Sequence, residues 1–142
     1  MKITICSSAA FYKEANEVKN NLKKLGHKVT VPVTARKMEK SNNYKVADYK
    51  VWYSDPKFYF KKAALMKKHF KEVEKSEAIL VINLLKNGVK NYIGGNVLME
   101  MAIAFYLGKK IYLLNPVPKI AYQEEILGFM PIVINGHLEK IT

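Results

Sequence analysis

The feature that most constrains the fold is an alternation of strand-like and helix-like segments along the chain. Two strand-like segments, Ala78–Leu84 and Ile111–Leu114, are almost entirely apolar, which is typical of parallel strands covered by helices on both faces. Further strands are predicted over Lys2–Cys6, His27–Val33 and Pro131–Asn135. Apolar residues three and four positions apart predict helices over Tyr12–Leu25, Phe58–Lys75, Asn96–Leu107 and Ala121–Leu127. The polar stretch Thr34–Lys57 is expected to be irregular.

This order of elements predicts an α/β fold. We expect one doubly wound, mostly parallel five-stranded sheet of the flavodoxin or Rossmann-like kind, with helices on both faces. Residues 1–142 should form a single domain, because a chain of 142 residues can bury a core without metal or disulfide support. In the flavodoxin-like order the first strand lies beside the third, and ligands bind beyond the carboxyl ends of these strands.

Three short polar or glycine-rich segments should meet at that edge of the sheet and form a ligand crevice. The expected ligand-binding residues are Ser7, Ser8, Phe11, Asn83, Gly94, Gly95 and Asn96. Hydroxyls and helix-terminal amides at such places can hold a sugar or a phosphate, although plain turns with serine and glycine are equally common. The glycine spacing matches neither a Walker A loop nor the dinucleotide fingerprint, which disfavours nucleoside triphosphates and NAD.

Glu100 is the single charged residue of the helix predicted over Asn96–Leu107. All other faces of that helix are apolar, which predicts that the helix is buried, with Asn96 as its N-cap. No Lys or Arg lies three or four residues from Glu100, and an unpartnered buried carboxylate is destabilising or has a raised pKa. We therefore expect Glu100 to face the crevice and to act there. The alternative is a rim glutamate that accepts a hydrogen bond from a loop amide.

The stretch YIGGNVLMEMAIAFYLGKKIYLLN, Tyr92–Asn115, resembles the core motif of the nucleoside 2-deoxyribosyltransferase-like family, which includes the 2′-deoxynucleoside 5′-phosphate N-hydrolases. The shared pattern is a glycine-containing loop, a helix with a Glu and small residues, a Gly, a basic residue and a strand. The resemblance covers most of the chain and is clearest over residues 78–135. It implies that Glu100 attacks C1′ of the sugar and forms a covalent glycosyl-enzyme, which passes the sugar to another base or to water.

The chain departs from that family at several positions. Asn83 stands where the transferases have an Asp, and Asn91 falls near a second family Asp. In the best register His69 replaces an Asp of the N-hydrolases, and Gly94 replaces their phosphate-binding Ser, which leaves backbone amides for an anion. The acid that protonates the leaving base is therefore not identified. The candidates are His69, Glu72 and a Tyr.

The remaining reactive side chains have structural alternatives. His69 lies on the apolar stripe of its predicted helix, where a hydrogen-bonded core histidine is more common than an acid or base. Cys6 ends a buried strand and lacks an evident base, which favours a structural thiol. No His, Cys or carboxylate pair has metal-ligand spacing, so the sequence predicts no metal and no cofactor. The single Cys and the lack of a signal-peptide pattern after Met1 predict a cytoplasmic protein.

The net charge of +12 comes from 24 basic and 12 acidic residues. Arg36 is the only Arg, and readers of nucleic acids usually exploit the guanidinium fork. The lysines are spread along the chain, which indicates solvated helix faces first, an anionic small molecule second and nucleic acid last. No apolar run is long enough to span a membrane.

Two classes of function follow from the sequence. The first is cleavage or transfer of the N-glycosidic bond of a nucleoside or nucleoside monophosphate, with Glu100 as the nucleophile. The second is a non-catalytic nucleotide-binding module on the same fold, in which Glu100 bonds ribose hydroxyls. The aromatic stretch YKVADYKVWYSDPKFYF, Tyr44–Phe60, is expected either to stack on a base or cover the crevice, or to be an edge segment or a dimer contact. We expect at least a homodimer, with residues 34–60 as its interface.

Overall fold

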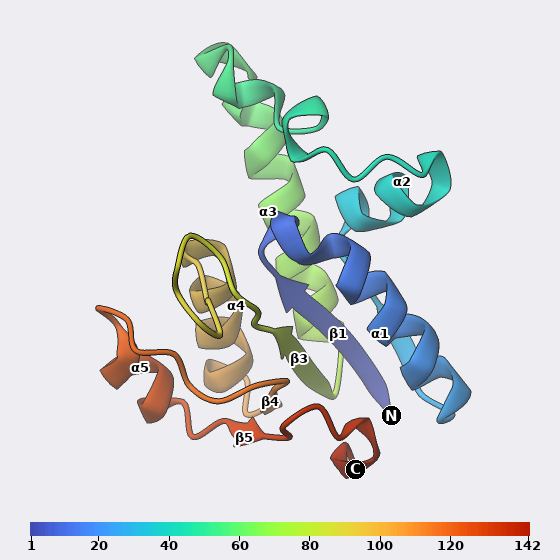
Figure 1. Ribbon diagram of the computed structural model, residues 1–142, viewed down its shortest axis with the longest axis vertical. Coiled ribbons are helices and arrows are strands. Elements are labelled where there is room, and N and C mark those ends of the chain that lie inside the picture. The colour runs from blue at the N-terminus through green and yellow to red at the C-terminus, as the bar shows by residue number, and fades with distance from the viewer.

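A parallel five-stranded sheet forms the centre of the molecule (Figure 1), and the computed structural model describes residues 1–142. The strands are β1 (Lys2–Ser7), β2 (Lys28–Thr30), β3 (Ala78–Ile82), β4 (Lys110–Leu113) and β5 (Ile132–Val133). Their order is β2-β1-β3-β4-β5, and every adjacent pair is parallel. The predicted doubly wound α/β fold, with the first strand beside the third, is confirmed.

Two hydrophobic layers enclose the sheet, one on each face. Along β1, Ile3 and Ile5 belong to one layer and Cys6 belongs to the other, as the alternation of a strand requires. The helices are α1 (Tyr12–Lys24), α2 (Val33–Ser41), α3 (Tyr59–Lys75), α4 (Gly95–Tyr106) and α5 (Gln123–Gly128). The layer around Ile3 contains residues of α1 and α2, and the layer around Cys6 contains residues of α3, α4 and α5. Helices therefore cover both faces.

The segment between β2 and α3 is more regular than its composition suggested. Helix α2 occupies Val33–Ser41, within the region predicted to be irregular, and β2 ends at Thr30, earlier than predicted. Val31, Ala35 and Met38 are buried at a spacing of four and three residues, which is a helical signal that the neighbouring charges obscured. After Asn42, which takes a left-handed conformation with φ 51°, the chain forms three short 3-10 turns before α3.

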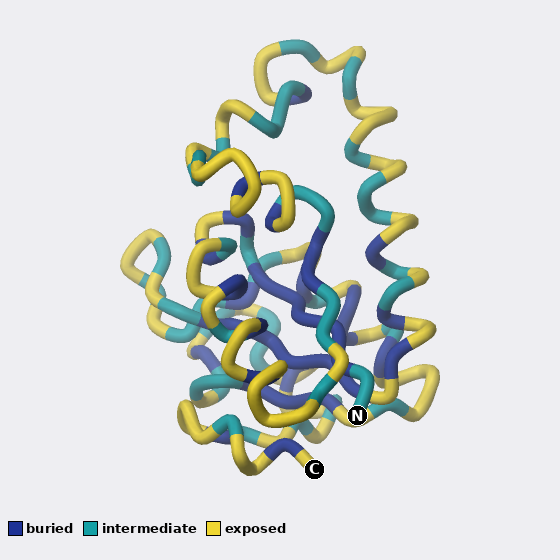
Figure 2. Tube along the Cα trace, turned by 90° about the vertical axis from the view of Figure 1, so that its right-hand side faces the viewer, coloured by how far each residue is buried: buried dark blue, intermediate teal, exposed yellow.

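Helix α3 extends beyond the sheet (Figure 1). Its buried residues, His69 and Val73, both lie in its C-terminal half. The N-terminal half and the turns that precede it stand above the strands and, apart from the buried Trp52, are half-buried or exposed (Figure 2). These segments form an overhang beyond the carboxyl end of β1, where the flavodoxin-like order predicts the ligand.

Helix α4 is only partly buried, which corrects the prediction that it is enclosed on all sides. It begins at Gly95 with Gly94 as N-cap, and not at Asn96. Val97, Met101 and Ala104 pack into the core, but Phe105 and Tyr106 are exposed, the latter by 87%. The apolar outer face of α4 thus meets solvent in the single chain. None of the helices combines the length and the apolar character needed to cross a bilayer.

Candidate functional site

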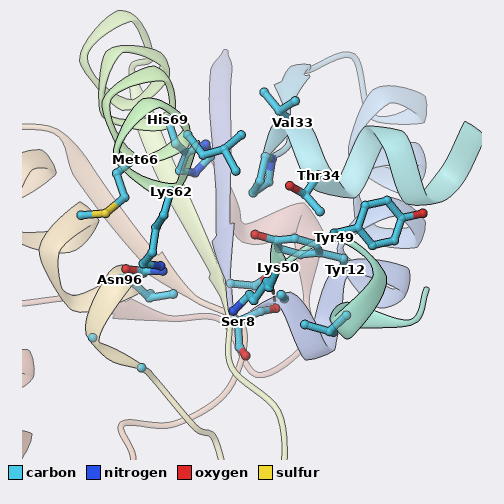
Figure 3. A pocket seen from close by; sticks show the side chains of 18 of the residues that line it. Ser8, Tyr12, Val33, Thr34, Tyr49, Lys50, Lys62, Met66, His69 and Asn96 are labelled. Atoms are coloured by element: carbon cyan, nitrogen blue, oxygen red, sulfur yellow. Dashed lines mark hydrogen bonds between the residues drawn. The ribbon is translucent and has the colours of Figure 1, made fainter. Parts of the chain in front are cut away.

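A pocket of about 410 Å³ opens at the carboxyl end of β1, beneath the overhang of α3 (Figure 3). This volume lies in the range of small-molecule sites. Aromatic side chains form much of the wall, and three lysines line it with a single carboxylate. The aromatic residues are Tyr12, Tyr49, Trp52, Tyr53, Tyr59, Phe70 and Tyr92; the lysines are Lys50, Lys62 and Lys86; the carboxylate is that of Glu100. The arrangement suits a planar, anionic ligand.

Glu100 lies on the buried side of α4 and lines the pocket, as predicted. The residue is 9% exposed, and its Oε2 atom is buried without a hydrogen-bond partner. Burial raises the pKa of the carboxyl group to about 8, against smaller lowering effects of Cys6 and Lys62. The carboxylate does not accept a hydrogen bond from a loop amide, so the alternative role of Glu100 as a rim glutamate does not describe this structure.

Two further buried side chains lie directly beside Glu100. His69 Nε2 is 3.8 Å from Glu100 Oε1 and 3.7 Å from Cys6 Sγ. Burial lowers the pKa of His69 to about 4, so the imidazole is neutral at pH 7. Burial and the adjacent Glu100 raise the pKa of the Cys6 thiol. Cys6 therefore has a neighbouring imidazole that the sequence did not reveal, yet its thiol stays protonated, as expected of a structural cysteine.

The loop after β1 and the start of α4 form the other end of the pocket. Ser7, Ser8, Gly94, Gly95 and Asn96 all line it, in agreement with their expected position. Ser8 Oγ accepts a hydrogen bond of 2.8 Å from Lys86 Nζ, and the same ammonium lies over the Tyr92 ring. A Cβ atom on Gly94 would approach the Tyr92 hydroxyl to 3.1 Å, so a larger residue at position 94 would displace that ring.

Two of the predicted ligand-binding residues do not reach the pocket. Phe11 packs into the core layer around Ile3. Asn83 is 0% exposed and joins the loops after β3 and β4 through bonds to Asn115 and Pro116. Both residues follow a strand, as predicted, but their side chains turn into the protein and have structural roles.

Sequence reasoning missed several side chains that line the pocket. Tyr12 follows the Ser7-Ser8 turn, and burial and Glu100 raise the pKa of its hydroxyl. Lys62 precedes His69 by seven residues and so shares its face of α3; its ammonium lies 5.5 Å from the centre of the Trp52 ring. The seven-residue spacing was a usable signal. The position of the loop that carries Lys50 and Trp52 was not, because it depends on tertiary packing.

None of the three pocket lysines forms a salt bridge with a carboxylate. Burial and the charge of Lys50 lower the pKa of Lys62 and of Lys86, as expected of cations gathered around a shared space.

No protein-family model matches the chain, and no curated protein matches it. The pocket and the motif around Glu100 are therefore the features that indicate a function.

Proposed function

We propose that this protein cleaves or transfers the N-glycosidic bond of a nucleoside or nucleoside monophosphate, with Glu100 as the nucleophile. The observation that carries the proposal is the unpartnered, buried Oε2 of Glu100 at an aromatic, lysine-lined pocket. A buried polar atom without a hydrogen-bond partner is destabilising, so its presence favours a role in binding or catalysis. The resemblance of Tyr92–Asn115 to the core motif of the nucleoside 2-deoxyribosyltransferase-like family supports the same role for Glu100.

With a pKa of about 8, the Glu100 carboxyl group is mostly protonated at pH 7. In the proposed reaction it loses this proton to solvent or to a neighbouring group, and the carboxylate attacks C1′ of the sugar. The bond between C1′ and the base nitrogen breaks, its electron pair leaves with the base, and a proton from the protein neutralises that base. Water or the nitrogen of a second base then attacks C1′ of the glycosyl ester, loses a proton and restores the carboxylate. The aromatic walls of the pocket position the sugar and reduce its contact with bulk water.

Tyr12 and Lys62 are better placed than His69 to protonate the leaving base. His69 is neutral, and its Nε2 faces Cys6 and Glu100 at the bottom of the site. Tyr12 carries its proton but is a weak acid because its pKa is raised. Lys62 points into the pocket from α3 toward Asn96 (Figure 3), and its lowered pKa makes its ammonium group a better proton donor. Both side chains offer a proton within the space that the base would fill.

The pocket lysines predict a preference for a phosphorylated substrate. We expect Lys86→Met to raise KM for a nucleoside monophosphate by about 10-fold, because one charge-assisted contact to phosphate is lost. KM for the unphosphorylated nucleoside should change little. Steady-state kinetics on both substrates measure this difference, with Lys68→Met on the exposed face of α3 as the matched control. Equal effects of Lys86→Met on the two substrates would contradict a phosphate contact.

The second candidate function is a non-catalytic nucleotide-binding module. The observation in its favour is that Glu100 is the only carboxylate among the pocket-lining residues, so the pocket offers no second carboxylic acid for the leaving base. Incubation with a panel of nucleosides and monophosphates, followed by chromatographic assay of free base, separates the two functions. Base release from one of them supports the enzyme. Saturable binding of a nucleotide without base release supports the module.

We also expect a homo-oligomer, at least a dimer. Tyr53, Tyr59 and Phe60 are exposed on the overhang, within the aromatic stretch predicted to form an interface. Exposed aromatic groups of this kind are enriched at subunit contacts. Light scattering at working concentration should give at least twice the mass of 16.3 kDa, and Phe60→Glu should shift the population toward the monomer. A monomeric mass for the unmodified protein contradicts this expectation.

A further inference from the structure

Cys6, His69 and Glu100 come from three separate elements, β1, α3 and α4, and converge at one buried point. One donor atom from each residue lies within 4.8 Å of the other two. The sequence predicted no metal because no two ligand types are spaced for a local motif. Three ligands from distant elements produce no such spacing, so the sequence carries no local signal of this cluster.

The distances between the donor atoms fit a small tetrahedral ion. In a zinc site with bonds of about 2.3 Å to sulfur and 2.0–2.1 Å to nitrogen or oxygen, neighbouring ligand atoms lie about 3.3–3.6 Å apart. The observed separations are 3.7 Å from Cys6 Sγ to His69 Nε2 and 3.8 Å from His69 Nε2 to Glu100 Oε1. The third pair, Cys6 Sγ and the Glu100 carboxylate, lies within 4.8 Å. Side-chain shifts of up to about 1 Å would therefore bring all three ligands to zinc-binding distance.

The charges also fit a divalent ion. A thiolate from Cys6 and a carboxylate from Glu100 would neutralise Zn²⁺, so the complex could be buried without net charge. Without such an ion, two acidic groups share an apolar site, and Glu100 Oε2 has no hydrogen-bond partner. The backbone of Ile5 lies near the His69 ring and favours its protonated form, so an acceptor of the kind that orients metal-binding histidines is close to the ring.

We propose that Cys6, His69 and Glu100 bind one Zn²⁺ ion, with the fourth coordination position open to the pocket. His69 and Glu100 both line the pocket, so a water molecule or a ligand group can complete the tetrahedron from that side. Cys6 lies behind them at the end of β1 and provides the thiolate that selects zinc over magnesium or calcium.

This inference does not rest on the proposed function. Zinc binding would occupy the carboxylate that the glycosidase reaction needs, so Zn²⁺ would inhibit base release if the protein is that enzyme. The metal site is tested by binding alone. A failure to release base from any nucleoside therefore leaves the zinc result intact, and a failure to bind zinc leaves the proposed reaction intact.

The test is titration of the reduced, chelator-treated protein with Co²⁺, a spectroscopic substitute for zinc. We expect one equivalent to bind, with a thiolate-to-cobalt charge-transfer band and the visible bands of four-coordinate cobalt, both removed by Zn²⁺. Cys6→Ser should abolish the charge-transfer band. Glu100→Gln, whose neutral amide is a poor ligand, should keep that band and weaken zinc binding by about 100-fold.

His137→Gln is the matched control, because exposed His137 lies 3.0 Å from Glu139 and could hold an adventitious ion. This variant should bind zinc as tightly as the unmodified protein. The proposal is overturned if no charge-transfer band develops, or if Glu100→Gln binds zinc as tightly as the unmodified protein. Glu100→Gln also removes a buried acidic group without a partner, so its folding should not limit the test.

Discussion

Glu100→Gln should abolish base release and also raise the melting temperature of the metal-free protein. The amide has nearly the same shape as the carboxylate but cannot form a glycosyl ester, so we expect turnover to fall by at least ~10³-fold. Nucleotide affinity should change little. A gain in stability together with loss of activity is expected because the variant removes a buried acidic group whose Oε2 has no hydrogen-bond partner.

The stability gain should depend on pH with a definite sign. The pKa of Glu100 is about 8 in the folded protein and 4.5 as the ordinary value, so between these pH values the folded state holds a proton that the unfolded state has lost. The contribution of Glu100 to the stability of the unmodified protein therefore falls as pH rises from 4.5 to 8. The amide of Glu100→Gln does not titrate. The free energy of unfolding of the variant should therefore exceed that of the unmodified protein only slightly at pH 5 and by about 4 kcal/mol at pH 8, which corresponds to roughly 10 °C in melting temperature.

His69 does not alter that comparison. Its pKa of about 4 lies below the ordinary 6.5, which makes the stability of both proteins rise between pH 4 and 6.5. Thermal melts at pH 5 and pH 8 in the presence of a chelator measure the difference. Glu17→Gln, at an exposed position on α1, is the matched control and should shift neither the melting temperature nor the turnover. A Glu100→Gln protein that is less stable at pH 8, with turnover retained, would contradict the nucleophile role.

Asn83→Ala should destabilise the protein strongly. The Asn83 side chain donates to the carbonyls of Asn115 and Pro116 at 3.0 and 3.1 Å and accepts from the Asn115 amide at 2.9 Å. Removing three buried hydrogen bonds and leaving their partners without bonds should cost about 3 kcal/mol, a loss of roughly 10 °C in melting temperature.

The same variant decides between a structural and a ligand-binding role for Asn83. Because the side chain does not line the pocket, KM of the folded variant should stay near that of the unmodified protein. Asn20→Ala, at an exposed position on α1, is the control and should change stability by less than about 0.5 kcal/mol. Unchanged stability combined with a large rise in KM would show that Asn83 contacts the ligand after all.

The sheet could be predicted because neighbouring residues in the sequence show the alternation of strands and helices. The apolar runs over β3 and β4 and the helical spacing of α1 and α3 determined the parallel topology and the edge at which a ligand would bind. Helix α2 was missed because its charged residues outnumber its apolar ones, although Ala35 and Met38 bury one face. The exposure of Phe105 and Tyr106 was missed because an apolar sequence does not say which of its faces the fold covers.

The candidate site was predictable at the level of its buried carboxylate and its two loops. Glu100 was identified because burying a charge in an apolar helix is costly without a function or a partner. The two loops were identified because ligands bind beyond the carboxyl ends of parallel strands. The contact of Cys6 with His69 joins residues 63 positions apart, which no local spacing reveals. Trp52 and Lys50 reach the pocket through a loop whose path depends on how it packs against α3.

The central claim is that Glu100 becomes covalently bonded to the sugar during turnover. Rapid acid quenching of the protein with a nucleoside monophosphate substrate, followed by peptide mass spectrometry, tests this directly. We predict a mass increase of one sugar phosphate on the peptide that contains Glu100, absent in Glu100→Gln, with release of one free base per adduct. Base release without an adduct at any time before steady state, or an adduct on another residue, would contradict the account.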